Sequence, residues 1–403
     1  MYGTGKGARQ YHEQQARLQR QARFSHSMPT HTLLIRADAS ATIGVGHVMR
    51  MLALGEAVVH GHELRCEVAC ASLPEPIATM IQSAGIAVHR LDVAIGSPED
   101  AQATAALAKR LGAPAVVLDG YQFHNAYQES LKREGLAVVL VDDVAAADSY
   151  SADVIVNHNP YATPDMYLPR SGPARLLLGA RYVLLRREFL PWKGFHRDTP
   201  RIARNLLVTF GGADSNRNTE KALEAIRQLE QPIHAKVVVG QANPRFASLA
   251  ARGSNPDATI EVVQAGDGFP ELLAWADMAL GAAGTTTWEL AFMGVPSVLM
   301  PTADNQLLVA RTAEEKGIAI NLGWHDEVTS EMLSAALNAL SCNDLRRREM
   351  SQRGQALIDG LGAERVAHEL ADTLLPHGGP LPPDSGRAEP RRRTRKRLSS
   401  NPE

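Results

Sequence analysis

The sequence is poor in cysteine and has no long apolar run. Three cysteines occur among its 403 residues, with no CxxC pair and no histidines at metal-site spacing beside them. So few cysteines cannot build a disulfide framework, and a reducing compartment, the cytoplasm, is favoured. No apolar run reaches the ~18–20 residues that cross a bilayer, which argues against a membrane span.

Neither sign of charge is in excess. The 42 Lys and Arg residues face 44 Asp and Glu residues, which gives a formal net charge of −2. A molecule so balanced offers no general attraction to nucleic acid or to an anionic membrane, and we expect neither as a partner. Apolar residues form 44% of the chain, enough for two buried cores at the usual domain size of roughly 100–200 residues. No feature of the sequence sets the oligomeric state, and we expect a monomer.

Both ends differ from the middle of the chain. Residues 1–30 are rich in Gln, Arg and His and lack the apolar core of a secretory signal. We predict an arm without a folded role there, with an amphipathic transit segment as the alternative. Residues 376–403 are Pro-rich and then basic, and such a segment cannot bury enough surface to fold. We predict a solvated tail, with contact to RNA or anionic lipid as the alternative.

Between residues 32 and 320, short apolar runs alternate with amphipathic helical stretches. The runs are near-continuously apolar, which is typical of parallel strands covered on both faces. The predicted strands are TLLIRA, LRCEVAC, AVVLD, LAVVLVDD and DVIVN in the first half, and NLLVTF, HAKVVV, TIEVV, DMALG and PSVLM in the second. This alternation predicts an α/β fold of two Rossmann-like, doubly wound parallel-sheet domains, at 31–195 and 196–375, facing a cleft.

Open parallel sheets bind ligands beyond the carboxyl ends of their strands, and two facing sheets place that site between them. The loop after the first strand, TIGVGHVMR, holds Gly44, Gly46 and His47. It is no dinucleotide fingerprint, because Met49 stands where the third glycine is required, and no GK[ST] of a Walker loop follows. The glycines indicate only a sharp turn or a close approach to a ligand.

His47 is the candidate general base. It follows a strand, is preceded by Gly46 and opens a helix at the expected crevice. The positive end of a helix disfavours the imidazolium form, so we expect a neutral ring that can accept a proton. The alternative is a histidine that only caps the helix.

Two loops of the second domain carry glycines and small polar side chains. Gly211 and Gly212 follow the strand NLLVTF. In GAAGTTTWEL, amides at a helix start and threonine hydroxyls form a ready anion site, and the glutamate can accept two hydrogen bonds from a ribose diol. The alternative is a threonine-capped helix with a surface glutamate. The candidate binding residues of this loop and of the PTADNQ rim are Gly284, Thr285, Thr286, Glu289, Asp304, Asn305 and Gln306.

The absence of a second catalytic carboxyl group limits which reaction we expect. Hydrolysis of an ordinary glycoside needs a second carboxyl group to protonate a poor leaving group. A nucleoside diphosphate leaves as a stable anion, so one base to activate water and donors for the diphosphate are sufficient. His47 on one domain and the 281–289 loop on the other would supply these functions. The acidic pair Asp142 and Asp143 has small or apolar neighbours, and we predict neither a metal nor a cofactor.

Five motifs together resemble a known family. In order over about residues 32–372, they are IRADASATIGVGHVMRMLALGEAV, LVDDVAAADSYSADVIVNHNP, LLLGARYVLLRREF, VTFGGAD and GAAGTTTWELAFMGVPSVLMPTADNQ. They are similar to the UDP-2,4-diacetamido-2,4,6-trideoxy-β-L-altropyranose hydrolases of pseudaminic acid biosynthesis. The resemblance implies a GT-B-like fold and a reaction in which water attacks C1 of the UDP-sugar, UDP leaves and the diacetamido sugar is freed.

The resemblance also implies roles for single residues. The base of the family, the histidine of its G-x-G-H loop, falls on His47, and the asparagine of its NQ pair, which is linked to the active site, falls on Asn305. The ribose-binding glutamate falls on Glu289, and an aromatic residue near the sugar falls on Tyr121. Independently of the family, we expect Asp38 to support the His47 loop.

Two other functions fit the same residues. A glycosyltransferase would use the same UDP-sugar with a sugar or lipid acceptor in place of water. A lipid acceptor calls for an apolar, basic patch on the first domain, which the sequence does not show. The other function is nucleotide-sugar binding without catalysis. Release of UDP without an acceptor separates hydrolysis from transfer, and substitution of His47 separates catalysis from binding.

Overall fold

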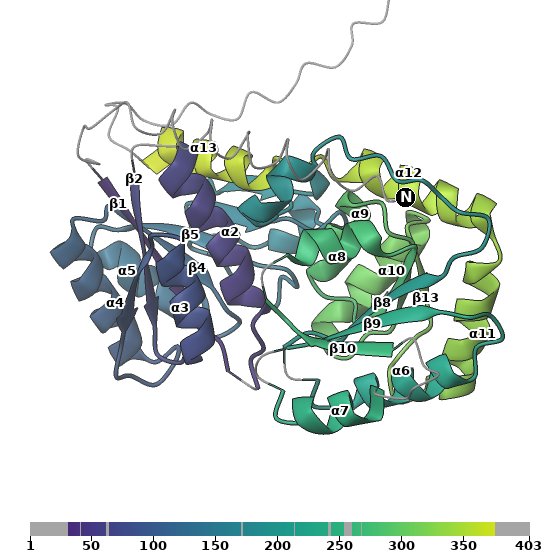
Figure 1. Cartoon of the computed structure of the whole chain (residues 1–403). Helices are drawn as coiled ribbons and strands as arrows, with labels where there is room; N and C mark the ends of the chain where they lie inside the picture. The colour runs from purple at the N-terminus through teal and green to yellow at the C-terminus, as the bar shows by residue number, and fades with distance from the viewer. Residues whose placement is uncertain are drawn as a thin grey trace, which may run out of the picture.

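The computed structural model describes residues 31–40, 42–61, 64–170, 172–212, 214–240, 243–253, 260–266 and 268–374. The predictions for residues 1–30 and 376–403 lie outside the described residues. Within these ranges the chain forms two α/β lobes side by side, each built on a parallel sheet that helices cover (Figure 1).

The first lobe contains a seven-stranded parallel sheet in the order β3-β2-β1-β4-β5-β6-β7. Its strands are β1 (His31–Ala37), β2 (Leu64–Cys70), β3 (Ala87–Arg90), β4 (Ala115–Asp119), β5 (Ala137–Val141), β6 (Val154–Asn157) and β7 (Arg175–Leu178). Its helices are α2 (Gly46–Gly61), α3 (Glu75–Ser83), α4 (Pro98–Leu111) and α5 (Asn125–Arg133). The short 3-10 helices η1 (Pro164–Tyr167), η2 (Ala180–Tyr182) and η3 (Arg187–Trp192) follow.

The second lobe contains a six-stranded parallel sheet in the order β10-β9-β8-β11-β12-β13. Its strands are β8 (Asn205–Thr209), β9 (His234–Val239), β10 (Ile260–Gln264), β11 (Met278–Gly281), β12 (Ser297–Leu299) and β13 (Ala319–Asn321). Its helices are α6 (Asn218–Arg227), α7 (Phe246–Gly253), α8 (Phe269–Trp275), α9 (Thr286–Phe292), α10 (Leu307–Glu315), α11 (Ser330–Ser341) and α12 (Asp344–Leu357), with η4 (Asp304–Gln306) before α10.

The apolar runs of the sequence form the strands, because strands covered by helices on both faces have no solvent side. β4 and β6 in the first lobe and β11 in the second are buried at every residue. The prediction of two doubly wound parallel-sheet domains is confirmed. The strands that the sequence did not indicate, β3, β7 and β13, are three or four residues long and lie at sheet edges. Runs so short carry no readable periodicity.

The chain enters the second lobe earlier than the predicted boundary at residue 195. In the segment 182–185, Tyr182 and Leu184 join the core of the first lobe, whereas Val183 and Leu185 join a core of the second. Alternating side chains of an extended segment point to opposite sides, so one short segment serves both cores. The following helix η3 packs on the second lobe.

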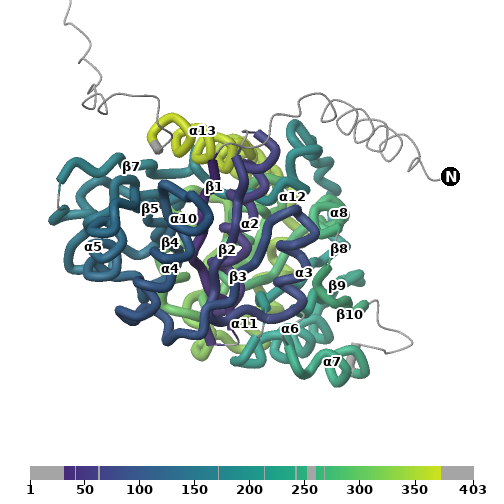
Figure 2. The backbone as a smooth tube through the Cα atoms, turned by 90° about the vertical axis from the view of Figure 1, so that its left-hand side faces the viewer, coloured from purple at the N-terminus to yellow at the C-terminus, as the bar shows by residue number. Residues whose placement is uncertain are grey.

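The last described helix, α13 (Gly362–Leu374), returns to the first lobe. Its apolar side chains join the core of that lobe, and it packs against α2 (Figures 1 and 2). Gly362 begins the helix against the crossing segment, where a Cβ would collide with the carbonyl oxygen of Val183. Residues 362–374, predicted to belong to the second domain, are therefore part of the first lobe.

Candidate active site

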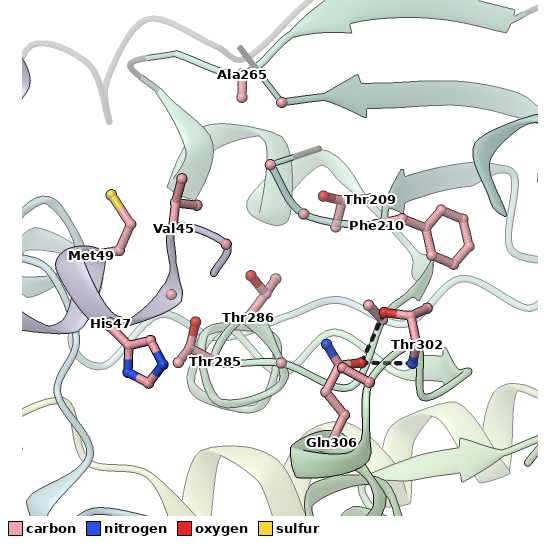
Figure 3. A pocket seen from close by; sticks show the side chains of 18 of the residues that line it. Val45, His47, Met49, Thr209, Phe210, Ala265, Thr285, Thr286, Thr302 and Gln306 are labelled. Carbon is pink, nitrogen blue, oxygen red and sulfur yellow. Dashed lines mark hydrogen bonds between the residues drawn. The ribbon is translucent and has the colours of Figure 1, made fainter. Parts of the chain in front are cut away.

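A cavity of about 510 Å³ lies between the two lobes. Its walls are the loops that follow β1, β2, β5 and β6 in the first lobe and β8 to β12 in the second (Figure 3). The strand order reverses between β1 and β4 and between β8 and β11, and the cavity lies at the carboxyl ends of these strands. This is where open parallel sheets bind their ligands.

Most of the predicted site residues line this cavity. They are Gly44, Gly46 and His47 from the first lobe, and Gly211, Gly212, Gly284, Thr285, Thr286, Glu289, Asn305 and Gln306 from the second. In Figure 3 the loop that carries Val45 and His47 faces the segment that carries Thr285 and Thr286. Segments far apart in the sequence thus meet across the space between the lobes.

Asp38 and Asp304 do not line the cavity. The carboxylate of Asp38 accepts hydrogen bonds from the backbone amides of Ala71 and Ser72 and from Arg36. It therefore fixes the loop after β2, whereas we expected it to support the loop that carries His47. Asp304 is exposed on the rim, outside the cavity lining.

His47 is held by a carboxylate at the end of a neighbouring strand. Its Nδ1 lies 2.7 Å from Oδ1 of Asp119, the last residue of β4. Since a carboxylate only accepts, Nδ1 donates to it, and in the neutral tautomer of the ring the lone pair lies on Nε2. Burial by itself would raise the pKa of Asp119, but the Arg50 guanidinium and His47 bring it below its ordinary value. The ionised Asp119 carboxylate thus fixes both the tautomer and the orientation of the ring.

Arg50, one helical turn after His47 on α2, ties this pair to a second carboxylate. Its Nε and Nη2 each lie 2.6 Å from an oxygen of Asp119, and its Nη1 lies 2.9 Å from Oδ2 of Asp143. Nη2 also lies 3.0 Å from Nδ1 of His47. The two nitrogens do not bond to each other, because both donate to the same oxygen of Asp119. This bidentate arrangement leaves His47, Arg50 and Asp119 little freedom to move.

Tyr121 and Asn305 join the two lobes beside His47. Nδ2 of Asn305 donates a hydrogen bond of 2.9 Å to the hydroxyl oxygen of Tyr121. The Tyr121 ring meets the His47 ring edge-on, with centroids 4.9 Å apart. Burial and then the Asp143 carboxylate raise the pKa of Tyr121 above its ordinary value, so the phenol stays protonated. Tyr121 lies outside the cavity lining, but it contacts two residues that belong to it.

The wall from the second lobe is made largely of backbone. The loops after β8 and β9 touch, and a Cβ on Gly240 would collide with the backbone of Gly212. Gly212 also approaches the first lobe, because a Cβ there would lie 3.2 Å from a methyl carbon of Val45. Helix α9 begins at Thr286 with Thr285 as its N-cap residue, and the first amides of a helix have no partner within it. This wall thus presents N–H and hydroxyl groups to the cavity.

Glu289 is held by an arginine that follows the crossing segment. Nη2 of Arg186 lies 3.3 Å from Oε1 of Glu289, and Nη1 lies 2.5 Å from Oε1 of Glu188. Burial raises the pKa of Glu188 to about 7, Arg186 opposes this rise, and Glu289 adds to it. Arg186 and Glu289 both line the cavity, so the ion pair forms part of its wall.

Sequence analysis missed several polar residues of this site, among them Arg50, Asp119, His158 and Arg186. Asp119 and His158 did carry a signal, since Asp119 ends a predicted strand and His158 directly follows one. Arg50 lies three residues after His47, a spacing at which helical side chains meet. Arg186 carried no signal, because its position depends on where the chain crosses between the lobes.

Within the described ranges, no group of three or more His, Cys, Asp or Glu side chains is arranged to hold a metal ion. Of the helices in the described part of the chain, none is both long and apolar enough to cross a membrane.

Comparison with known sequences finds one matching domain family and a similar protein that spans most of the chain. Residues 205–366 match the family described as the glycosyltransferase family 28 C-terminal domain. Over 348 residues, 84% of this chain and 97% of the relative, the sequence is 25% identical to the spore coat polysaccharide biosynthesis protein SpsG of Bacillus subtilis (strain 168).

Solved structures show the same two-lobed architecture. MurG of Acinetobacter baumannii has a TM-score of 0.61 at 17% identity, covering 85% of this chain and 99% of that chain. The UDP complex of MnaA from S. aureus has a TM-score of 0.58 at 13% identity, covering 85% of this chain and 96% of that chain. The chain therefore has the GT-B fold, and its residues 205–366 are similar to the C-terminal domain of glycosyltransferase family 28.

Proposed function

We propose that this protein hydrolyses a UDP-linked 2,4-diacetamido-2,4,6-trideoxy sugar to UDP and the free sugar. The observation that carries the proposal is the pair of His47 and Asp119, in which a buried carboxylate orients an imidazole at the cavity wall. The five sequence motifs, which resemble the hydrolases of pseudaminic acid biosynthesis, supply the identity of the sugar. The similarity to SpsG, a polysaccharide biosynthesis protein, is consistent with a sugar nucleotide as substrate.

In the proposed step, His47 is the general base. Its Nε2 takes a proton from water while the water oxygen forms a bond to C1 of the sugar. The bond between C1 and the diphosphate oxygen breaks, and its electron pair leaves with UDP. Asp119 stabilises the imidazolium that forms, as a buried carboxylate does for other catalytic histidines. Tyr121 and Asn305, bonded to each other beside His47, enclose the reacting end of the sugar.

The second lobe holds the leaving group in this proposal. Backbone amides and hydroxyls of Thr285 and Thr286 bind the diphosphate at the start of α9. The Glu289 carboxylate accepts hydrogen bonds from the ribose diol. Arg186 positions this carboxylate through one oxygen, which leaves acceptor sites for the diol.

A glycosyltransferase is the second candidate, because residues 205–366 match a glycosyltransferase domain. His47 would then remove the proton of an acceptor hydroxyl instead of that of water. The first lobe also lines the cavity with apolar side chains on which an acceptor could pack: Ile43, Val45, Met49, Pro74, Ile77 and Met80.

Incubation with the UDP-linked diacetamido sugar and no acceptor tests the proposal. We expect UDP and free sugar to appear in equal amounts, as followed by NMR. His47→Ala should abolish this turnover and change the Kd for UDP by less than about tenfold, or ~1.4 kcal/mol. UDP release that requires an added sugar acceptor would show transfer instead of hydrolysis. Turnover that survives His47→Ala would remove the histidine from the mechanism.

A further inference from the structure

His158 is a second histidine in the cavity wall. It directly follows β6, is 1% exposed and lines the cavity. The backbone N–H of Leu184 donates a hydrogen bond of 3.2 Å to its Nδ1. Nδ1 therefore holds the lone pair, and the proton of the neutral ring lies on Nε2.

The His158 ring cannot act as a second base at neutral pH. Burial and then the Arg50 guanidinium lower the pKa of His158 to about 3, against the opposing effects of Asp143 and Asp119. No described residue accepts a hydrogen bond from Nε2. His158 lines the cavity, and because its Nδ1 is already bonded to the Leu184 amide, Nε2 is the ring nitrogen left for a ligand. The ring thus offers one fixed N–H to the cavity.

The next residue, Asn159, also lines the cavity and has a spare donor. Its Oδ1 accepts a hydrogen bond of 3.0 Å from Nε1 of Trp288, and its Nδ2 donates one of 3.0 Å to Oδ1 of Asn157. What remains for a ligand is the second N–H of the Asn159 amide. The side chains of residues 158 and 159 together match a group that accepts hydrogen bonds and donates none.

The surrounding charges disfavour an anion at this place. Arg50 is shared between Asp119 and Asp143, so these three groups together carry a negative charge. None of the three is an unpaired cation, so the loss of water around a phosphate oxygen would go uncompensated there. A neutral carbonyl oxygen, which only accepts hydrogen bonds, satisfies both donors without this cost.

We propose that His158 is a permanently neutral hydrogen-bond donor that binds the carbonyl oxygen of an acylamino group on the sugar. The inference rests on the proposed UDP-sugar site, but it holds whether the sugar is hydrolysed or transferred. It assigns recognition of the sugar to the first lobe and leaves the diphosphate to the second. A sugar without such an oxygen would leave buried N–H groups unpaired and would be rejected.

Two substitutions of His158 test whether its side chain donates a hydrogen bond to the ligand or only binds the Leu184 amide. His158→Gln keeps an amide N–H near the place of Nε2 but removes the acceptor for Leu184. His158→Asn keeps an oxygen near the place of Nδ1, where it can accept from Leu184, but removes the donor into the cavity. If His158 served only to bind the Leu184 amide, the asparagine variant would be the better tolerated one.

Calorimetry of the full chain with UDP-N-acetylglucosamine and with UDP measures the effect. We expect His158→Asn to weaken binding of UDP-N-acetylglucosamine about tenfold or more, and His158→Gln to weaken it less than about threefold. Affinity for UDP should stay within about twofold in both variants. A larger loss in His158→Gln, a parallel loss of UDP affinity, or equal affinity for the two ligands in every variant would overturn the proposal.

A measurement on the unaltered protein does not depend on the folding of any variant. We expect the 15N NMR signal of the His158 Nε2–H to be that of a protonated, neutral ring and to shift when UDP-N-acetylglucosamine is added, but not with UDP. An unshifted signal would contradict the proposal. Since neither experiment measures turnover, absence of hydrolysis would count against the proposed function alone.

Discussion

The two walls of the cavity are built by different means. The first lobe uses charged side chains that hold one another, with Arg50 between Asp119 and Asp143 and the ring of His47 against Asp119. The second lobe uses tight turns, helix-start amides and hydroxyls, with one ion pair beside them. Backbone groups suit the diphosphate of a UDP-sugar, whereas proton transfer and sugar recognition require side chains in fixed positions. The comparison predicts that substitutions in the first wall change kcat and that those in the second change nucleotide affinity.

The largest effect is expected from Asp119→Asn. An amide no longer fixes His47 in the tautomer that leaves Nε2 as base, so kcat should fall about 10²–10⁴-fold. The Kd for UDP should change little. Kinetics with the UDP-linked sugar and calorimetry with UDP provide the two readouts.

Asp100→Asn is the matched control. Asp100 is equally buried and binds Arg36 through both oxygens, at 2.9 and 2.8 Å, outside the cavity lining. Both substitutions leave a buried arginine short of a carboxylate and should lower the free energy of unfolding by up to about 3–5 kcal/mol. Only Asp119→Asn should lower kcat. Equal kcat values for the two variants would contradict the role of Asp119.

An intermediate effect is expected from Glu289→Gln in the other wall. Loss of charge-assisted hydrogen bonds to the ribose should weaken UDP binding by about 1–3 kcal/mol. At saturating substrate, kcat should stay near that of the unaltered protein. Glu188→Gln, which alters the other carboxylate on Arg186, is the control and should keep UDP affinity. Unchanged affinity in Glu289→Gln would mean that the ribose lies elsewhere.

The smallest effect is expected from Glu188→Gln on stability. Because the pKa of Glu188 is raised from 4.5 to about 7 in the folded protein, the folded state binds more protons between these values. The contribution of Glu188 to the free energy of unfolding therefore falls as pH rises through this window, by at most about 3 kcal/mol, and is constant above pH 7. His158 acts in the opposite direction, since its low pKa reduces stability as pH falls below 6.5.

Thermal unfolding between pH 4.5 and 7.5 measures this balance. Glu188→Gln removes the contribution of Glu188, which offsets that of His158 on acidification. The free energy of unfolding of the variant should therefore fall more on acidification than that of the unaltered protein. Identical pH profiles for the two proteins would show that the Glu188 carboxyl titrates normally in the folded state.

Local patterns in the sequence were sufficient for ten of the thirteen described strands and for the glycine loops, but not for the partners of the histidines. Asp38 and Asp119 both lie at strand ends. The sequence favoured Asp38 as the support of the His47 loop, because Asp38 is nearer to His47 along the chain. In the sheet, Ala37 of β1 pairs with Asp119 of β4. Side chains paired in this way share a face of the sheet, and Asp38, one residue further along, points to the other face. Strand order and register therefore decide which of the two carboxylates lies on the side of His47, and neither can be read from the sequence of one strand alone.

The crossing at residues 182–185 and the return of α13 mean that neither lobe is a contiguous piece of the chain. A protein truncated before residue 362 would contain every described strand of both sheets. It would lack α13, which packs against α2, the helix that carries His47 in its first turn. Shortening the carboxyl end thus harms the opposite half of the molecule, and separately produced halves would each lack part of their own interior.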